Sequence, residues 1–233
     1  MSAAPAGHAE VVVVTGGGGA LGQAIVATML EQGATVVAVD RDAGALSTVP
    51  EGAVVEAADL GDPDEVDALF ARVAEAHGEP VAVVHAVGAY RDGDATASTA
   101  EDFLSMIDVN LHTAWWVSRA AGARMRRAGR GAIVLVAARQ GVEAVPGAAA
   151  YSVSKAAVAH LARVLDAELR EHGVRVNAIV PRLIDTPANR RAMPAGAMAR
   201  AVAPESIARV VAFLAGADAA PVVGAVVPVY GAL

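Results

Sequence analysis

The run EVVVVTGGGGALG, from Glu10 to Gly22, constrains the fold more than any other stretch of the chain. Its continuous β-branched part is typical of a strand that is buried on both faces in a parallel sheet. A turn of glycines follows at once, and the pattern then predicts an amphipathic helix through Gln32, with Gly33 as its C-terminal stop. Because the first N–H groups of such a helix are free, this strand, turn and helix predict a phosphate-binding site. A flexible turn is the alternative interpretation of the glycines.

The same alternation of strand and helix continues along the chain. Further strands are expected at residues 34–39, 53–57 and 80–85, from residue 133, and at residues 174–180 and 225–229. Helical patterns separate them, and Pro228 indicates that the last strand lies at an edge of the sheet or near its end. This order predicts an α/β fold with a doubly wound (Rossmann) parallel sheet of about seven strands and helices on both faces.

Length and composition favour a single domain. The chain has 233 residues, 55% of them hydrophobic, and no shift in composition divides it. We expect a flexible N-terminus at residues 1–9 and one dinucleotide-binding domain at residues 10–233. This domain includes a polar loop at about residues 182–203, of the kind that closes over a bound substrate.

Charge and cysteine content limit the classes of partner and compartment. The net charge of −7 gives no electrostatic reason to expect a nucleic-acid partner or an anionic membrane. No apolar run approaches the length that spans a bilayer, and the first ten residues do not resemble a signal peptide. The absence of cysteine excludes disulfides and fits a reducing, cytoplasmic location. The six histidines show no metal-binding spacing, so no metal site is expected.

Residues at the strand ends point to a dinucleotide cofactor. Asp40 ends the second strand, where a carboxylate accepts hydrogen bonds from the ribose hydroxyls of NAD and repels the 2′-phosphate of NADP. NAD is therefore favoured over NADP, although Arg41 could hold a phosphate and Asp40 could instead begin a turn. Asp59 could meet the adenine or simply begin a loop. The candidate cofactor-binding residues on this side are Gly16, Gly19, Leu21, Gly22, Asp40, Asp59, Leu60 and Gly88.

Tyr151 and Lys155 are candidates for acid and base chemistry. They stand four residues apart in a predicted helix, so both side chains project from one face of it. Asn110 lies inside a helix predicted at about residues 100–125, where it either faces solvent or has a fixed partner. His85 ends the fourth strand and is interpreted as a core histidine, with catalysis as the alternative.

Several short motifs resemble those of the short-chain dehydrogenase/reductase family. They are VTGGGGALG at residues 14–22, DVN at 108–110, YSVSK at 151–155, VNAIVP at 176–181, and Thr186. The likeness covers nearly the whole chain, from Val11 to Gly231. The chain departs from the family pattern at four places: Ala20 for the middle glycine of the turn, Ala86–Val87–Gly88, Arg182, and Ala138, which stands where the family has its substrate-binding serine.

The resemblance implies roles for these residues. Tyr151 would exchange a proton with the substrate while hydride passes to or from nicotinamide, and Lys155 would lower the tyrosine pKa and hold the nicotinamide ribose. Asn110 would hold a water of the proton path. The candidate catalytic residues are thus Tyr151, Lys155 and Asn110, and the cofactor-binding set gains Tyr151, Lys155, Pro181 and Thr186. A homotetramer or homodimer is expected from the resemblance alone.

Ala138 leaves two hypotheses open. Loss of one preorganised donor to a developing oxyanion costs about 2.7–4 kcal/mol, or roughly 10²- to 10³-fold in rate. An NAD(H)-dependent oxidoreductase could tolerate this loss with a small organic substrate that carries a C=O, C=N or quinonoid group. It could also use a replacement donor from Arg139, Gln140, Tyr90 or His85. The alternative is a protein that binds the dinucleotide without redox turnover, as a regulator, a partner subunit or a non-redox catalyst.

The substrate pocket is expected in three loops, around Tyr90, at residues 140–145 and at residues 184–199. Arg182 and Arg190 either select an acidic substrate or are solvated. Loop composition does not specify a ligand, so the sequence predicts the place of the substrate and not its identity.

Overall fold

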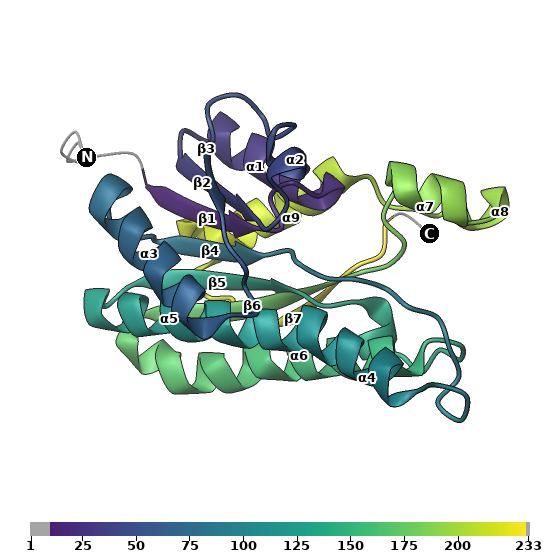
Figure 1. The fold of residues 1–233 in the computed structure, drawn as a ribbon. Coiled ribbons are helices and arrows are strands. Elements are labelled where there is room, and N and C mark those ends of the chain that lie inside the picture. The colour runs from purple at the N-terminus through teal and green to yellow at the C-terminus, as the bar shows by residue number, and fades with distance from the viewer. Residues whose placement is uncertain (1–9, 232–233) are drawn as a thin grey trace.

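The computed structural model describes residues 10–231, and the flexible N-terminus predicted at residues 1–9 lies outside this range. Its centre is one parallel sheet of seven strands in the order β3-β2-β1-β4-β5-β6-β7 (Figure 1). The strands are β1 Val11–Thr15, β2 Thr35–Asp40, β3 Val54–Ala57, β4 Ala82–His85, β5 Gly131–Val136, β6 Val174–Pro181 and β7 Val226–Val229. The predicted doubly wound sheet is confirmed, and β7 with Pro228 is an edge strand as expected.

Helices cover both faces of this sheet (Figure 1). They are α1 Ala20–Glu31, α2 Ala43–Leu46, α3 Pro63–His77, α4 Ala100–Ile107, α5 Thr113–Ala128, α6 Ala149–Leu169, α7 Pro187–Ala192, α8 Ala195–Met198 and α9 Pro204–Ala215. α1 and α9 pack together on one face, while α3, α5 and α6 lie on the other. No helix within residues 10–231 is long and apolar enough to cross a bilayer.

Two hydrophobic cores fill the space between the sheet and these helices. Val13, Val37 and Ile133 belong to the core beneath α3, α5 and α6, whereas Val12 and Val36 belong to the core beneath α1 and α9. Successive residues of a strand face opposite sides of a sheet, so a strand that is covered on both faces needs an uninterrupted apolar run. The sequences VVVVT of β1 and AVVH of β4 supply such runs.

The strand order reverses between β1 and β4, and this reversal locates the site. β1 pairs with β2 on one side and with β4 on the other, so the chain crosses to the opposite half of the sheet after β3. Thr15 and His85, the last residues of β1 and β4, are paired in register. Ligands of doubly wound sheets bind at the carboxyl ends of the strands, at the point of reversal. The fold therefore places a candidate site beyond Thr15 and His85.

The glycine turn after β1 leaves little room for side chains, and two of its glycines show why. Gly16 has a φ of +72°, a conformation that residues with a Cβ rarely adopt. Gly22 lies in the first turn of α1, and a Cβ there would stand 1.9 Å from the carbonyl oxygen of Gly16. Ala20, which replaces a glycine of the family motif, is exposed at the first position of α1. Its methyl group is therefore accommodated.

The helix predicted at about residues 100–125 is present, although it is not α-helical throughout. It is interrupted by the π-helical turn Asp108–His112, after which α5 continues to Ala128. A π-helical turn is rare and occurs mostly as a single turn inside an α-helix, so the sequence of one chain does not mark it clearly. The start of the helix is as predicted, because Thr99 and Asp102 form a capping box there.

The polar loop predicted at about residues 182–203 contains two short helices, α7 and α8. Thr186 caps α7, where its hydroxyl accepts a hydrogen bond from the N–H of Asn189 at 3.1 Å, and Pro187 occupies the first helical position. A threonine followed by proline is a known helix-start signal. Figure 1 shows α7 and α8 standing away from the sheet, beyond the carboxyl end of β6.

Substitution of Gly22 tests the packing of the glycine turn. Gly22→Ala drives a methyl group against a backbone carbonyl, so we expect it to lower the free energy of unfolding by about 1–3 kcal/mol or more. Gly19→Ala is the matched control, since a Cβ at Gly19 would stand 3.3 Å from the same oxygen and should cost less. Urea unfolding measures both. Equal stabilities would show that the turn shifts freely and that the packing argument is wrong.

Candidate active site

A large cavity lies at the carboxyl ends of β1, β2 and β4. Its volume is about 800 Å³. The predicted cofactor-binding residues that line it are Gly16, Gly19, Asp40, Asp59, Leu60 and Gly88. Leu21 and Gly22 are instead buried within α1, Pro181 ends β6 and Thr186 caps α7. The structure thus brings the strand-end residues together around one space.

The two carboxylates predicted to bind the cofactor also accept hydrogen bonds from backbone N–H groups of nearby turns. Asp40 accepts hydrogen bonds from the N–H of Gly18 at 3.3 Å and from that of Asp42 at 3.2 Å. Asp59 accepts one from the N–H of Gly61 at 2.9 Å. The turn-forming role considered for each is therefore present, and both residues also lie on the wall of the large cavity.

Lys155 brings a charge into the interior, with only 4% of its surface exposed. Its ammonium donates a hydrogen bond to the carbonyl oxygen of Val136 at 2.9 Å. Burial lowers the pKa of Lys155 from 10.5 to about 8, because the charged form loses its hydration. A Cβ on Gly88 would stand 2.7 Å from the Nζ atom of Lys155 and 2.8 Å from Oδ1 of Asn110. Only glycine at this position leaves both side chains in place.

Asn110 belongs to the π-helical turn and is fully buried. Its amide donates to the carbonyl oxygen of Ala89 at 3.1 Å and to the hydroxyl of Ser154 at 3.1 Å, while its Oδ1 accepts from the N–H of Ala89 at 3.0 Å. Of the two situations considered from the sequence, the structure shows the fixed partner. Asn110 thereby ties the segment after β4 to α6, beside Gly88 and Lys155.

His85 is a core histidine, as interpreted from the sequence. It is 1% exposed, and its ring nitrogens meet the hydroxyls of Thr15 at 2.8 Å and Thr113 at 3.1 Å. Thr113 donates its own proton to the carbonyl of Val109 at 2.7 Å, so it must accept from the Nε2–H of His85, which leaves Nδ1 to accept from Thr15. A neutral ring satisfies both partners. Burial, and then the charge of Lys155, lower the pKa of His85 from 6.5 to about 3.

Tyr151 lies at the start of α6, one turn before Lys155, and is half-buried. Burial raises the pKa of Tyr151 from 10.0 to about 12, and the neighbouring Tyr90 adds to the rise. This direction is opposite to the lowering that the family resemblance implies, because desolvation is the largest effect on the phenol. The ring of Tyr90 meets that of Tyr151 edge to face, with 5.0 Å between the ring centroids and 72° between the planes.

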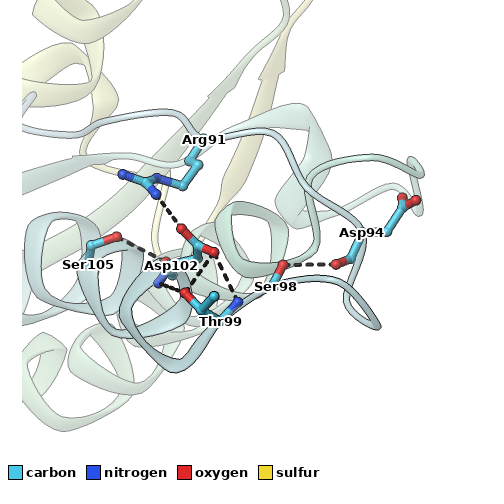
Figure 2. A network of polar contacts seen from close by, with 6 residues as sticks. All are labelled: Arg91, Asp94, Ser98, Thr99, Asp102 and Ser105. Atoms are coloured by element: carbon cyan, nitrogen blue, oxygen red, sulfur yellow. Dashed lines mark hydrogen bonds and ion pairs between the residues drawn. The ribbon is translucent and has the colours of Figure 1, made fainter.

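Arg91 fixes the segment between β4 and α4 to the start of α4 (Figure 2). Its guanidinium pairs with the carboxylate of Asp102. The same carboxylate accepts hydrogen bonds from the N–H of Thr99 at 2.9 Å and from its hydroxyl at 2.8 Å. These bonds from Thr99 lower the pKa of Asp102, which keeps the partner of Arg91 charged. Further along the segment, the hydroxyl of Ser98 donates to the carbonyl oxygen of Asp94 at 2.8 Å.

Gly93 fastens the same segment to the start of α6. Its N–H donates to the carbonyl of Gly147 at 2.8 Å, and its carbonyl accepts from the N–H of Ala149 at 3.0 Å. Together with the ion pair of Arg91, this bridge restrains the stretch of chain that carries Tyr90. The contact between the two tyrosine rings follows from these restraints.

A second cavity, of about 480 Å³, opens beside the two tyrosines. Its wall consists of Tyr90, Arg139, Gln140, Tyr151, Arg182, Leu183, Ile184, Asn189, Met193, Gly196, Ala197 and Arg200. All three loops predicted to form the substrate pocket contribute to it. Tyr90 lines both cavities, whereas Tyr151, which is predicted to be catalytic, lines only the smaller one.

Ala138 is buried, with 4% of its surface exposed, just before a short 3₁₀ turn. Of the four side chains considered as substitutes for a serine hydroxyl, Arg139, Gln140 and Tyr90 line the smaller cavity. His85 does not, because both of its nitrogens are engaged in the core. Among residues 10–231, no group of three or more His, Asp or Glu side chains is arranged to hold a metal ion.

Two contributors to the site, Ser154 and Arg200, were not predicted from the sequence, and neither was the ring contact of Tyr90. Tyr90 was placed in a pocket loop, but its contact with Tyr151 depends on the fastening of that loop. Ser154, within the YSVSK motif, anchors Asn110. Arg200 reaches the smaller cavity from beyond α8. Only Ser154 carried a usable signal, because its spacing from Tyr151 places it near the same face of the helix.

Comparisons with known proteins agree with this geometry. A family model described as short chain dehydrogenase matches residues 10–195. The chain is similar to galactitol 2-dehydrogenase from Rhizobium johnstonii, with 38% identity over 94% of this chain and 93% of the relative. It is also similar to the 3-oxoacyl-(acyl-carrier-protein) reductase MabA of Mycobacterium tuberculosis, with 33% identity over 95% and 92%. A solved short-chain dehydrogenase/reductase structure from Burkholderia xenovorans has a TM-score of 0.90, 29% identity and 96% coverage of both chains.

The neutral state of His85 predicts a pH dependence of stability. The pKa is about 3 in the folded chain against an ordinary value of 6.5, so between these values the unfolded chain binds a proton that the folded chain does not. The free energy of unfolding should therefore fall as the pH drops from about 6.5 toward 3, by up to about 1.4 kcal/mol per pH unit.

Urea unfolding at stepped pH values measures this slope. His85→Gln should remove the part of the pH dependence that His85 causes, because the glutamine amide donates and accepts hydrogen bonds but does not titrate. His160→Gln, at an exposed position, is the control, and this variant should keep the pH dependence of the wild type. Identical slopes in the wild type and both variants would contradict the assignment of a neutral, buried histidine.

Proposed function

The chain belongs to the short-chain dehydrogenase/reductase family, and on that premise we propose that it is an NAD(H)-dependent oxidoreductase. It would transfer hydride between the nicotinamide and a small organic molecule that carries a C=O, C=N or quinonoid group. One observation carries the proposal: Tyr90 lines both cavities, Tyr151 lines the smaller one, and Lys155 and Asn110 lie against Gly88, which lines the larger one.

The residues of the larger cavity fit a dinucleotide. Its glycine turn allows backbone N–H groups to approach phosphates closely. The buried ammonium of Lys155 has three N–H donors and uses one on Val136, which leaves two for the hydroxyls of a ribose. We assign the phosphates to the glycine turn, the adenosine ribose to Asp40 and the nicotinamide ribose to Lys155 with Tyr151. The proposed binding set is completed by Leu21, Gly22, Asp59, Leu60, Gly88, Pro181 and Thr186.

When bound, the dinucleotide supplies or takes up the hydride, and the side chains of this protein move the proton. In the reducing direction, the hydroxyl of Tyr151 donates its proton to the substrate oxygen as that oxygen gains negative charge. Because burial raises the pKa of Tyr151 to about 12, the phenol holds this proton at neutral pH. In the family that the chain resembles, the lysine of this motif stabilises the phenolate, and we propose this role for Lys155 once the dinucleotide and substrate are bound.

Asn110 supports this chemistry by position. Its amide joins Ala89 to Ser154 and so holds the segment after β4 against α6. The segment begins with Gly88, whose lack of a side chain leaves the space that the ammonium of Lys155 occupies. We propose that loss of the amide would let the segment move and would disturb the Lys155 environment.

A second candidate function is favoured by the alanine at position 138. A protein of this fold that binds the dinucleotide without redox turnover, as a regulator, partner subunit or non-redox catalyst, would need no oxyanion donor there. The presence of Tyr151, Lys155 and Asn110 in one site argues against this function, because such a protein would not need them. The oxidoreductase is therefore the better-supported proposal.

Removal of the tyrosine hydroxyl tests the proposed proton transfer. Tyr151→Phe should lower kcat on any carbonyl, imine or pterin substrate found by screening by about 10²- to 10⁴-fold, the usual contribution of a general acid. Binding of NADH, followed by its fluorescence, should change little, which separates lost chemistry from lost folding. Unchanged turnover in the variant would refute the role of Tyr151.

Asp40 predicts a preference between the two cofactors. NADPH carries a 2′-phosphate that the carboxylate repels, so at equal concentration NADH should raise the melting temperature more than NADPH does. Asp40→Ala should narrow the difference, because the repulsion is removed. Scanning fluorimetry measures the shifts, and equal shifts in the wild type would remove the role assigned to Asp40.

A further inference from the structure

The smaller cavity carries a positive charge that the molecule as a whole does not share. Three guanidinium groups line it, those of Arg139, Arg182 and Arg200, and no carboxylate from residues 10–231 does. The whole chain has 18 Lys and Arg against 25 Asp and Glu, for a formal net charge of −7. Three cations around one concave space in an acidic protein concentrate anions there.

Two of these guanidinium groups have no ion-pair partner among residues 10–231. Arg139 lies 3.4 Å from the carboxylate of Glu143, which also accepts a hydrogen bond from the hydroxyl of Tyr230 at 2.9 Å. Within the described part of the chain, neither Arg182 nor Arg200 forms a salt bridge. Arg182 is also partly buried, so its charge is only partly screened by water. The cavity therefore has two cationic groups left for a ligand.

The one carboxylate between residues 182 and 203 is engaged elsewhere. Asp185 forms two hydrogen bonds with Arg190, at 2.5 Å and 2.7 Å, and these bonds lower the pKa of Asp185. Arg190 itself does not line the cavity. Of the two arginines considered from the sequence for an acidic substrate, Arg182 thus stays a candidate, Arg190 does not, and Arg200 joins it.

The rest of the cavity wall is largely apolar. Leu183, Ile184 and Met193 contribute hydrocarbon surface, and the amide of Gln140 adds a polar group. The side chain of Asn189 donates to the carbonyl of Ile184 at 2.8 Å and so holds this part of the wall in shape. A volume of about 480 Å³ is in the range of small-molecule sites. The cavity therefore suits a molecule with an apolar body and one anionic group.

We propose that the substrate is a small organic anion, a carbonyl compound or the corresponding alcohol with a carboxylate, sulfonate or phosphate group that Arg182 and Arg200 bind. This inference rests on the proposed oxidoreductase function and specifies the substrate class of that site. The planar fork of a guanidinium matches two oxygens of such a group. In the reduction, the carbonyl carbon gains the hydride and its oxygen gains the proton of Tyr151, while the anionic group is unchanged.

The first test is binding without turnover. Benzoate, benzenesulfonate and phenyl phosphate are compared with neutral benzamide by titration calorimetry in saturating NAD⁺. At least one anion should bind at least 10-fold more tightly than benzamide, and its affinity should fall as salt is added. Arg182→Gln and Arg200→Gln should each weaken it by about 10-fold or more. Arg191→Gln removes the same charge from an exposed position of α7 outside the cavity and should leave the affinity within twofold.

The second test compares turnover of matched charged and neutral carbonyl compounds. Phenylglyoxylate and 4-formylbenzoate are assayed with NADH against their methyl esters. In the wild type, the kcat/KM of each carboxylate should be at least 10-fold higher than that of its methyl ester. Arg182→Gln should reduce this preference for the carboxylate, mainly by raising its KM. Arg182→Lys, which keeps the charge but loses the fork, should restore part of it.

Three results separate the possible failures. Equal affinity for the anions and benzamide would overturn the proposed substrate class. If Arg182→Gln weakened NADH binding and left anion binding unchanged, the arginines would serve the cofactor and the inference would again fail. Selective anion binding without oxidation of NADH by any carbonyl compound would contradict the proposed oxidoreductase function. The anion site would remain supported in that case.

Discussion

The burial of one ammonium group, that of Lys155, is the constraint on which the rest of the site depends. A charge removed from water is costly unless partners lie close to it, and Lys155 has the carbonyl of Val136 at 2.9 Å. That hydrogen bond requires β5 to end beside α6, and the space for the ammonium requires a glycine at position 88. Asn110 contacts the same glycine. These contacts therefore fix the relative positions of four elements: the ends of β4 and β5, α6 and the π-helical turn.

The electrostatics of the two cavities differ, and the difference bears on the alanine at position 138. The larger cavity has both carboxylates and guanidinium groups on its wall. Among residues 10–231, the only charged groups on the wall of the smaller cavity are guanidinium groups. A positive potential next to Tyr151 favours the negative charge that develops on a reduced oxygen. We propose that the cationic cavity offers part of the stabilisation that a serine hydroxyl would supply, and that the same charge selects the substrate.

Much of the fold was predictable because a parallel sheet buried on both faces needs long apolar runs, and those ending at Thr15 and His85 are plain in the sequence. The π-helical turn Asp108–His112 was not, since such turns are rare inside α-helices and the sequence of one chain does not mark them clearly. Tyr151 and Lys155 were predicted as a pair from their spacing, and the structure places both on α6. The rise in the Tyr151 pKa and the place of Arg200 were not, because desolvation and loop direction depend on tertiary packing.

Hydride transfer is the central claim, and isotopic labelling tests it most directly. The protein is incubated with NADH deuterated at C4 of the dihydronicotinamide and with a panel of carbonyl, imine and pterin compounds, and products are analysed by mass spectrometry. Transfer of one deuterium to the former C=O or C=N carbon of at least one compound is the predicted result. If NADH binds but no deuterium reaches any compound, the protein is a dinucleotide-binding protein without redox turnover.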